Sequence, residues 1–163
     1  MEIETRIGQG MDIHRLVPGR ELWLGGVKLS FTRGLAGYSD GDVLAHAATD
    51  AILGAAGLGD MGRHFPSNDP RWKDASSIAM LTRAAGFVAG GGWQVDSLHV
   101  VLLLESPRIA SHTARMEHNL AGAIGAPVAA VNISSTTADG LGLVGTGEGA
   151  MASAVCLISR EKR

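Results

Sequence analysis

Three residues in the first third of the chain have the types and spacing of metal ligands. Asp12 and His14 stand two positions apart after a short apolar start, and His46 follows within the segment 39–46. Because side chains at positions i and i+2 of an extended chain point the same way, Asp12 and His14 can reach one point in space. His46, from the helix expected next, would complete a three-residue zinc site with one open position. A substrate oxygen could occupy that position, so the arrangement indicates chemistry rather than a structural metal.

The helix expected over residues 42–56 carries Asp42, His46 and Asp50 at intervals of four, so the three side chains line one face. One of these carboxylates could accept the second ring N–H of His46 and fix the orientation of the ring. The alternative is a surface helix with Asp42 as its cap and an incidental histidine. The preceding Asp12 and His14 favour the metal site.

Two loops and one strand end carry further polar residues. Residues 57–70 are dense in glycine, charge and proline, and could either close over a ligand or form a long connector. In residues 134–140, hydroxyls could hold phosphate oxygens and Asp139 could bind a hard cation. On those residues alone a plain turn is favoured there. Arg108 follows a strand and could pair with a phosphate, although a surface arginine is the commoner outcome.

Composition limits the class of protein. A chain of 163 residues, 45% of them hydrophobic, suits one domain over residues 1–163. A net charge of −2 without a long basic run argues against nucleic acid as a partner. No apolar run is long enough to span a membrane and no apolar signal core opens the chain, so we expect a cytoplasmic protein. The lone Cys156 excludes an internal disulfide and reads as a small hydrophobe.

The hydrophobic pattern predicts alternating strands and helices. Strands are expected at 3–8, 97–104, 128–134 and 151–158, with a hairpin over 21–29 turning at Gly25-Gly26, and helices at 42–56, 77–89 and 109–124. The apolar run 97–104 predicts a strand buried on both faces, which places His99 in the core. The fold class is therefore α/β, an α+β sandwich in which one mixed sheet carries helices on one face. An open sheet face would need cover, which suggests an oligomer.

Several motifs occur together in the order typical of one family. They are Gly-x-Gly-x-Asp-x-His at 8–14, Ser-Asp-Gly-Asp at 39–42 before His46, Gly-Asp-Met-Gly at 59–62, Phe-Pro at 65–66, Thr-Thr at 136–137 and Gly-Glu-Gly at 147–149. With them the chain resembles the 2-C-methyl-D-erythritol 2,4-cyclodiphosphate synthase family over nearly its whole length. The resemblance implies a homotrimer whose sheets face one another around the trimer axis, with active sites between neighbouring subunits. It also implies that a small nucleotide substrate, 4-diphosphocytidyl-2-C-methyl-D-erythritol 2-phosphate, is cyclised with release of CMP on the non-mevalonate route to isoprenoids.

The resemblance assigns roles to individual residues. It makes Asp12, His14 and His46 the zinc ligands and Asp139 a ligand of magnesium or manganese. Thr137 matches the residue that contacts the transition state, and Tyr38 stands where the family usually has a phosphate-facing histidine. The other positions that match substrate-binding residues are Ser39 at a phosphate, Asp60, Met61 and Gly62 at the ribose and backbone, Phe65 and Asp69 in a loop over the erythritol, Ser106, Pro107 and Arg108 at the cytidine phosphate, and Thr136 at the diphosphate.

Some positions depart from the family pattern. A phenol at Tyr38 can donate a hydrogen bond but carries no positive charge. Thr146 replaces an arginine, and Met11 and Leu143 replace phenylalanines, at positions that in the family line an axial cavity for an isoprenoid diphosphate. We expect weaker anion capture there. Two other functions remain open: a non-catalytic trimeric binder of nucleotide or prenyl phosphates, and a zinc phosphoesterase that uses metal-bound water.

Overall fold

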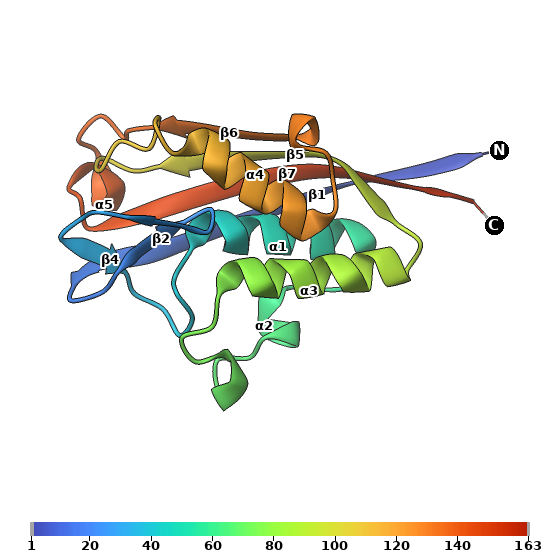
Figure 1. The fold of residues 1–163 in the computed structure, drawn as a ribbon, viewed down its shortest axis with the longest axis horizontal. Helices are drawn as coiled ribbons and strands as arrows, with labels where there is room; N and C mark the ends of the chain where they lie inside the picture. The colour runs from blue at the N-terminus through green and yellow to red at the C-terminus, as the bar shows by residue number, and fades with distance from the viewer. Residues whose placement is uncertain (1, 163) are drawn as a thin grey trace.

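The computed structural model describes residues 2–162 and is built around one mixed sheet. Its strands lie in the order β4 (Arg33–Leu35), β1 (Ile3–Pro18), β7 (Gly149–Glu161), β5 (Gln94–Leu103) and β6 (Val131–Thr136). β5 and β6 are parallel, and the other neighbours are antiparallel. The predicted mixed sheet is confirmed, and Figure 1 shows β1 and β7 running together along the molecule.

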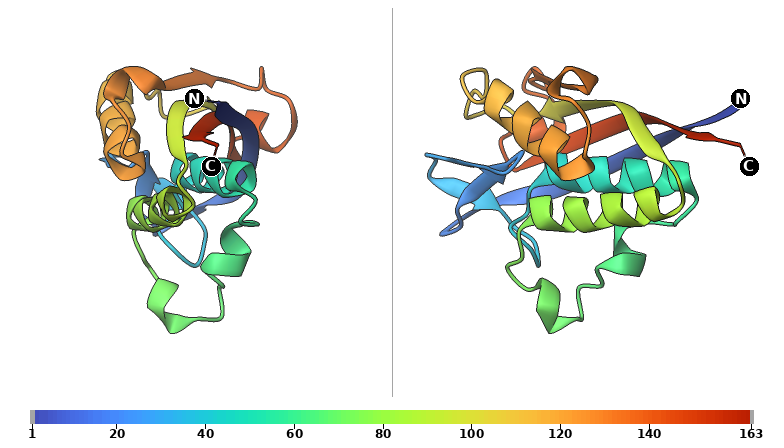
Figure 2. Two further views of the ribbon diagram at one scale, coloured as in Figure 1. Left: turned by 90° about the vertical axis from the view of Figure 1, so that its right-hand side faces the viewer. Right: turned by 45° about the vertical axis from the view of Figure 1, so that its right-hand side comes forward.

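Helices cover one face of this sheet, as predicted. α1 (Val43–Ala56) packs against β1 and β7, α4 (Thr113–Ile124) lies against β6, and α3 (Ser77–Gly90) packs against both helices. Figure 2 shows how the three helices are layered relative to the strands. Between them and the sheet lies a core rich in leucine, alanine and isoleucine, in which Cys156 is buried as a small hydrophobe and burial raises its thiol pKa to about 11.

The first strand is longer than the sequence predicted. We expected residues 3–8 to enter a loop carrying Asp12 and His14, but β1 continues to Pro18 because it pairs with β7 from Ile3 to Arg15 and then with β4 from Leu16 to Pro18. Both candidate ligands therefore lie within a regular strand. Asp12 and His14 therefore do share one face, and the paired strand fixes their positions more rigidly than a loop would.

Other boundaries agree with the predictions or shift by a few residues. The predicted hairpin is β2 (Leu22–Leu24) and β3 (Val27–Leu29), with Gly25-Gly26 between them. Asp42 caps the start of α1, and Gly57 ends it with a φ of 74°. α4 begins at Thr113 rather than Ile109, and the start of the strand predicted at 128–134 is instead a 3-10 turn, η2 (Val128–Ala130). α5 (Gly142–Gly145) precedes the glycine-rich turn into β7.

The prediction that residues 97–104 are buried on both faces was wrong for this chain by itself. Leu98, Val100 and Leu102 are buried, but Ser97 and His99, which alternate with them, are exposed. His99 is thus a surface residue of the open sheet face, with its Nε2 2.9 Å from Ser134 Oγ, and not a core histidine. Apolar side chains occupy both faces of β5 only in part, and composition alone did not separate them.

The uncovered face of the sheet is apolar along β1 and β7. Exposed there are Ile3, Ile7, Met11, Ile13, Val155 and Leu157, with Ile7 at 74% exposure. Because β1 and β7 are in register, these side chains lie next to one another on one face. Contiguous apolar surface of this kind marks an interaction site.

Two glycines let α1 lie unusually close to β1. A Cβ on Gly8 would lie 2.0 Å from the carbonyl oxygen of Ala51, and one on Gly10 would lie 2.1 Å from that of Ala47. Neither distance is compatible with a side chain. The strand and helix therefore touch backbone to backbone just before the position of Asp12.

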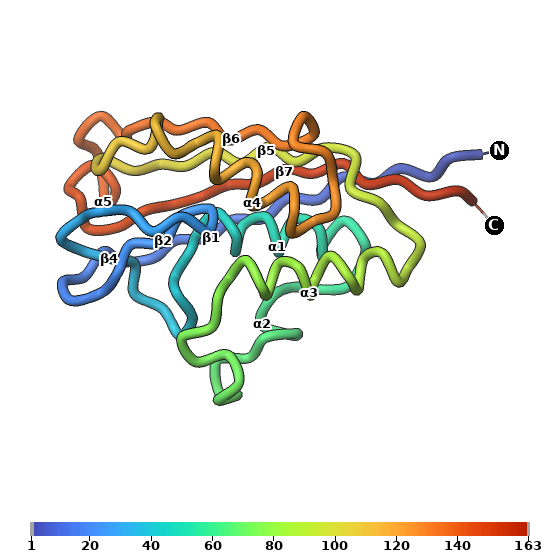
Figure 3. The backbone as a smooth tube through the Cα atoms, viewed as in Figure 1, coloured from blue at the N-terminus to red at the C-terminus, as the bar shows by residue number. Residues whose placement is uncertain are grey.

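The segment between α1 and α3 extends away from the rest of the molecule (Figure 3). It holds two short helical turns, α2 (Met61–His64) and η1 (Pro70–Trp72), where the sequence predicted only a polar loop. Among the helices of residues 2–162, none has the length and apolarity needed to cross a membrane.

Candidate active site

The three predicted metal ligands meet in the structure. Asp12 Oδ2 lies 2.8 Å from His14 Nε2 and 2.8 Å from His46 Nδ1, and the two ring nitrogens are 3.3 Å apart. Asp12 and His14 come from β1 and His46 from the first turns of α1. His14 is oriented by the contact of its Nδ1 with the carbonyl oxygen of Ala36. The cluster is therefore built by one chain from a strand and the helix packed on it.

The electrostatics of the cluster are those of donors drawn together. Burial opposes ionisation of Asp12, but hydrogen bonds from His14 and His46 outweigh it and hold the pKa of that carboxyl well below its usual range. Burial likewise opposes protonation of His14, yet its bonds to Asp12 and to the carbonyl of Ala36 raise its pKa. One carboxylate is hydrogen-bonded to two imidazoles, and a metal ion that binds there would take the place of the protons between them.

This donor set fits zinc. Ligand atoms bound at 2.0–2.1 Å in a tetrahedral zinc site are about 3.3 Å apart, which is the spacing of the two ring nitrogens, while the oxygen of Asp12 lies closer, at 2.8 Å from each. One carboxylate and two histidines leave one tetrahedral position for another ligand. Among the described residues, this is the group of histidine, cysteine and acidic side chains that could hold a metal ion.

The expected carboxylate support for His46 was wrong. Asp42 and Asp50 do lie along α1, but neither accepts the second ring N–H. Nε2 of His46 instead faces two hydroxyls, Ser77 Oγ at 2.8 Å and Ser39 Oγ at 3.0 Å. The two carboxylates are occupied elsewhere because backbone N–H groups of neighbouring segments reach them first.

Asp42 is a structural residue. Fully buried, its carboxylate accepts the N–H groups of Gly25 and Gly26 at 2.9 and 2.8 Å and those of Leu44 and Ala45 at the start of α1. It thereby ties the β2–β3 turn to the helix that carries His46. Burial, with the nearby charge of Asp40, raises the pKa of Asp42 to about 6.

The loop residues predicted to bind substrate start from a fixed anchor. Asp50 Oδ1 accepts the N–H of Met61 at 2.8 Å, and Asp60 caps α2 through the N–H of Arg63. Asp69 caps η1 and pairs with Arg71. Phe65 is buried and packs edge-on against Trp72, with ring centroids 4.9 Å apart. Apart from the anchor at Asp50, the loop is thus stabilised by contacts among its own residues. Gly62 remains exposed.

A second group of predicted residues gathers at the ends of the parallel strands β5 and β6. Leu104 N donates to Thr136 O at 3.1 Å, and Glu105 Oε1 accepts the N–H of Ala138 at 2.6 Å. The segments that follow the two strands are thus adjacent, and they carry the predicted side chains Ser106, Pro107, Arg108, Thr136, Thr137 and Asp139. Most of these side chains are exposed, and Asp139 has a φ of 54° in its turn.

The two groups do not form one pocket within a single chain. Ile13 pairs with Met151, Met151 with Leu103, and Leu103 with Thr136, so one row crosses the sheet from the metal ligands to the second group. Three strand spacings separate the ends of that row, roughly 14 Å. Asp12 and His14 also point to the helix face, whereas Thr136 lies on the open face.

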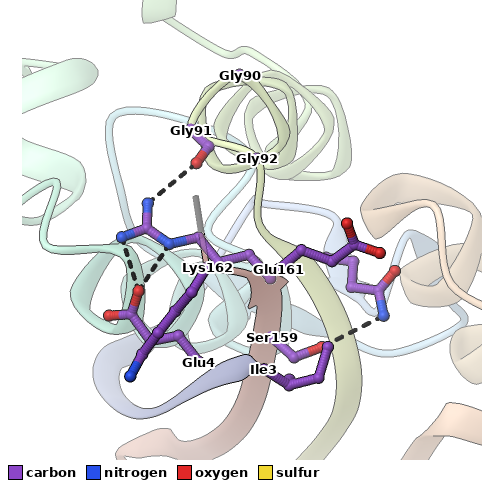
Figure 4. A pocket seen from close by; sticks show the side chains of 10 residues that line it. Ile3, Glu4, Gly90, Gly91, Gly92, Ser159, Glu161 and Lys162 are labelled. Carbon is purple, nitrogen blue, oxygen red and sulfur yellow. Dashed lines mark hydrogen bonds and ion pairs between the residues drawn. The ribbon is translucent and has the colours of Figure 1, made fainter. Parts of the chain in front are cut away.

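A cavity of about 1190 Å³ lies at the opposite end of the long strands (Figure 4). It is lined by Glu4, Ser159, Arg160 and Lys162 and by glycines 90–92, and Arg160 pairs there with Glu4. Nine positions of β1 separate Ile3, at this cavity, from Asp12, a distance of roughly 30 Å. The cavity is therefore distinct from the metal ligands. A smaller hollow of about 210 Å³ beside His14 is lined by Ile13 and Leu143.

Sequence analysis did not find the two residues that complete the surroundings of His46. Ser77 lies 31 positions after it, and Asp40 appeared only as part of the Ser-Asp-Gly-Asp motif at 39–42. No spacing rule links either residue to an imidazole, because the contact depends on how the start of α3 meets the start of α1. A serine at a helix start is ordinarily explained by capping.

The model of the YgbB family matches residues 5–159. A 2-C-methyl-D-erythritol 2,4-cyclodiphosphate synthase of Rubrobacter xylanophilus is 49% identical over 158 residues, which cover 95% of each chain.

Solved structures give the same result. The bifunctional enzyme IspDF of Campylobacter jejuni superposes with a TM-score of 0.94 at 35% identity, over 99% of this chain and 44% of that one. This chain therefore corresponds to less than half of the bifunctional protein. A 2C-methyl-D-erythritol-2,4-cyclodiphosphate synthase solved in a form bound to CDP superposes with a TM-score of 0.86 at 36% identity, over 94% of this chain and 99% of that one.

Proposed function

The chain belongs to the YgbB family, and from that membership we propose how its residues carry out the reaction of the family's 2-C-methyl-D-erythritol 2,4-cyclodiphosphate synthases. The chain converts 4-diphosphocytidyl-2-C-methyl-D-erythritol 2-phosphate to 2-C-methyl-D-erythritol 2,4-cyclodiphosphate and releases CMP, on the non-mevalonate route to isoprenoids. The observation that supports a catalytic chain most directly is the convergence of Asp12, His14 and His46.

The chemistry requires two anions to meet. An oxygen of the substrate's 2-phosphate attacks the β-phosphorus, and the bond from that phosphorus to the oxygen of CMP breaks. No protein nucleophile is needed, so catalysis depends on positioning the groups and on stabilising negative charge. A chain with a net charge of −2 has to supply positive charge locally.

Metal ions are the proposed source of that charge. Asp12, His14 and His46 would hold zinc, and Asp139 would contribute to a magnesium or manganese site. When bound, such ions polarise phosphoryl oxygens and neutralise charge that develops on the departing phosphate. Ser39 lies beside His46, where its hydroxyl supports a contact with a phosphate oxygen.

The residues at the strand ends take the nucleotide side of the substrate in this proposal. Thr137 donates its hydroxyl to the transferring phosphoryl group, with Thr136 beside it. Arg108, with Ser106 and Pro107, binds the phosphate of CMP. Their exposure on a single chain supports a role in contacts made with substrate or with a neighbouring subunit.

The remaining predicted residues would bind the sugar parts. Asp60, Met61 and Gly62 follow the anchor at Asp50 and would face the ribose. Phe65 and Asp69 lie in the segment proposed to cover the erythritol. Tyr38, about one-third exposed just before Ser39, would donate a hydrogen bond to phosphate in place of a charged imidazole.

We propose that the chain works as a homotrimer with each active site between two subunits. The separation of roughly 14 Å between the metal ligands and Thr136, on opposite faces of one sheet, supports a site that combines one group from each of two chains. The apolar open face of β1 and β7 supports burial of these faces against one another around the trimer axis.

Product analysis tests the reaction. The purified protein is given the cytidine diphospho-substrate with zinc and magnesium, and CMP and the cyclic product are followed together. Both products in equal amounts are expected. Substrate binding without CMP would instead identify a non-catalytic binder, and CMP with an uncyclised bisphosphate would identify a zinc phosphoesterase.

Subunit mixing tests the shared site. His46→Ala and Thr137→Ala chains are each expected to be nearly inactive, and mixed trimers should regain activity because some interfaces combine one intact group from each chain. Random mixing of equal amounts restores about one quarter of wild-type activity, since each intact group is present with a probability of about one half. No recovery, in mixtures shown by native mass spectrometry to be hetero-oligomers, would place each whole site within one chain.

A further inference from the structure

The second nitrogen of His46 lies in a buried chain of hydrogen bonds. Its Nε2 is 2.8 Å from Ser77 Oγ, and Ser77 Oγ in turn contacts Asp40 Oδ1. The backbone N–H of Ser77 donates to the other oxygen, Asp40 Oδ2, at 3.0 Å. Ser77 is fully buried and His46 nearly so. Hydrogen bonds are stronger in buried surroundings than in water, and an unpaired polar group there is costly, so each group in this chain needs a defined role as donor or acceptor.

That order follows from the chemistry of the three groups. An ionised carboxylate only accepts, so the hydroxyl of Ser77 donates a hydrogen bond to Asp40. The lone pair of Ser77 Oγ then accepts the N–H at Nε2 of His46. With a proton held on Nε2, the imidazole can give up the Nδ1 proton that faces Asp12 and offer the lone pair of Nδ1 to a metal ion.

We infer that Ser77 and Asp40 are positioning residues that fix the tautomer and orientation of His46 for metal binding. The inference rests on the proposed metal site, and it assigns a role to two residues that touch neither metal nor substrate. It also separates the two serines beside His46. Because Ser77 accepts the hydrogen bond from the ring, the hydroxyl of Ser39, which lies 3.3 Å from Ser77 Oγ, is left to donate to that oxygen or to a phosphate oxygen.

Two backbone hydrogen bonds connect the segment before His46 to the end of the substrate loop. Asp74 N donates to Tyr38 O at 2.8 Å, and Asp40 N donates to Ala75 O at 3.1 Å. The segment before α1 and the segment before α3 are therefore paired, and they meet in the tube view of Figure 3. Residues 57–76 end at this pairing, so the position of the loop's carboxyl-terminal end and the orientation of His46 depend on one another.

A purely structural role for Ser77 makes a different prediction. The start of α3 already has a cap, because Ser76 Oγ accepts the N–H of Ala79 at 3.3 Å. Ser76 is exposed and does not reach His46. Ser76→Ala is thus a matched control that removes a cap hydroxyl one residue away and leaves the hydrogen bond to the imidazole intact.

The experiment measures zinc affinity by competition with a chelator at constant pH, in Ser77→Ala, Ser77→Thr, Asp40→Asn and Ser76→Ala proteins. Ser77→Ala is expected to bind zinc 10- to 100-fold more weakly, the usual effect of losing a partner behind a metal-bound histidine. Asp40→Asn should lose less, Ser77→Thr should recover most of the affinity, and Ser76→Ala should match wild type. Activity of Ser77→Ala should return at saturating zinc.

Nitrogen-15 NMR of the histidine rings gives a second readout. The zinc-loaded wild-type protein should show His46 with its proton on Nε2, and Ser77→Ala should broaden or shift that signal. Wild-type zinc affinity in a folded Ser77→Ala protein would overturn the inference, as would an equal loss in Ser76→Ala. If the wild-type protein bound no zinc, the metal assignment would fail. The positioning role would be rejected separately if NMR of the wild-type protein showed no hydrogen bond between Nε2 of His46 and Ser77.

Discussion

The metal ligands and the strand-end residues are two halves of one proposed site, and they differ in how far a single chain completes them. Asp12, His14 and His46 are largely buried, and their donor atoms lie 2.8 to 3.3 Å apart. Thr137, Arg108 and Asp139 are exposed. A half that is fixed by backbone pairing and buried hydrogen bonds needs little further ordering when it binds its ligand. The exposed half must be ordered by substrate, by a cation or by a neighbouring subunit.

The sharpest test of this contrast removes a ligand from the preformed half. His46→Ala is expected to abolish bound zinc and to lower kcat/KM by more than about 1000-fold, beyond the roughly 100-fold that loss of an outer partner costs. Metal analysis and product formation are measured on the same sample. A folded variant that kept a full equivalent of zinc would contradict the ligand assignment.

A change in the exposed half should leave the metal in place. Thr137→Ala removes a hydroxyl proposed to stabilise the transferring phosphoryl group, and kcat should fall about 100-fold, as when one donor to a developing charge is deleted. Zinc content should stay at the wild-type level. Loss of zinc together with kcat would show that the two halves are not independent.

Breaking the oligomer should separate the halves in a different way. Ile7→Asp places a charge on the open apolar face, where Ile7 is 74% exposed. At low protein concentration the variant should dissociate and lose activity roughly 30-fold, because assembly follows mass action, yet each chain should still bind zinc. Light scattering and zinc titration give the two readouts, and Val128→Asp in η2, at a side chain that is 45% exposed and lies outside β1 and β7, is a matched control. A dissociated variant with full activity would contradict the shared site.

The smallest effect is expected at Arg108. Arg108→Gln removes one charged donor from the proposed CMP phosphate site, and KM should rise roughly tenfold, the effect of losing a hydrogen bond between charged groups. Adding salt should raise the KM of the wild-type enzyme more than that of the variant, because only the wild type has the exposed ionic contact that salt screens. Steady-state kinetics at two ionic strengths measure both effects.

The sequence predicted those parts of the site that depend on local spacing. Alternation along a strand placed Asp12 and His14 on one face, and the motif order identified the family. It did not predict that β1 extends past both ligands, because that depends on pairing with β7 at the other end of the chain. Nor did it predict Ser77, whose contact with His46 depends on the packing of two helix starts.

Two residues without side chains determine how deep His46 sits. At Gly8 and Gly10 the backbone of β1 meets carbonyl oxygens of α1 so closely that one methyl group would force the helix outward. A helix displaced by even one ångström would carry its imidazole away from the two ligands on the strand, whose own positions would not change. The metal geometry in this protein therefore depends on two glycines that bind no metal, because only a hydrogen atom at these positions lets the helix approach the strand closely enough.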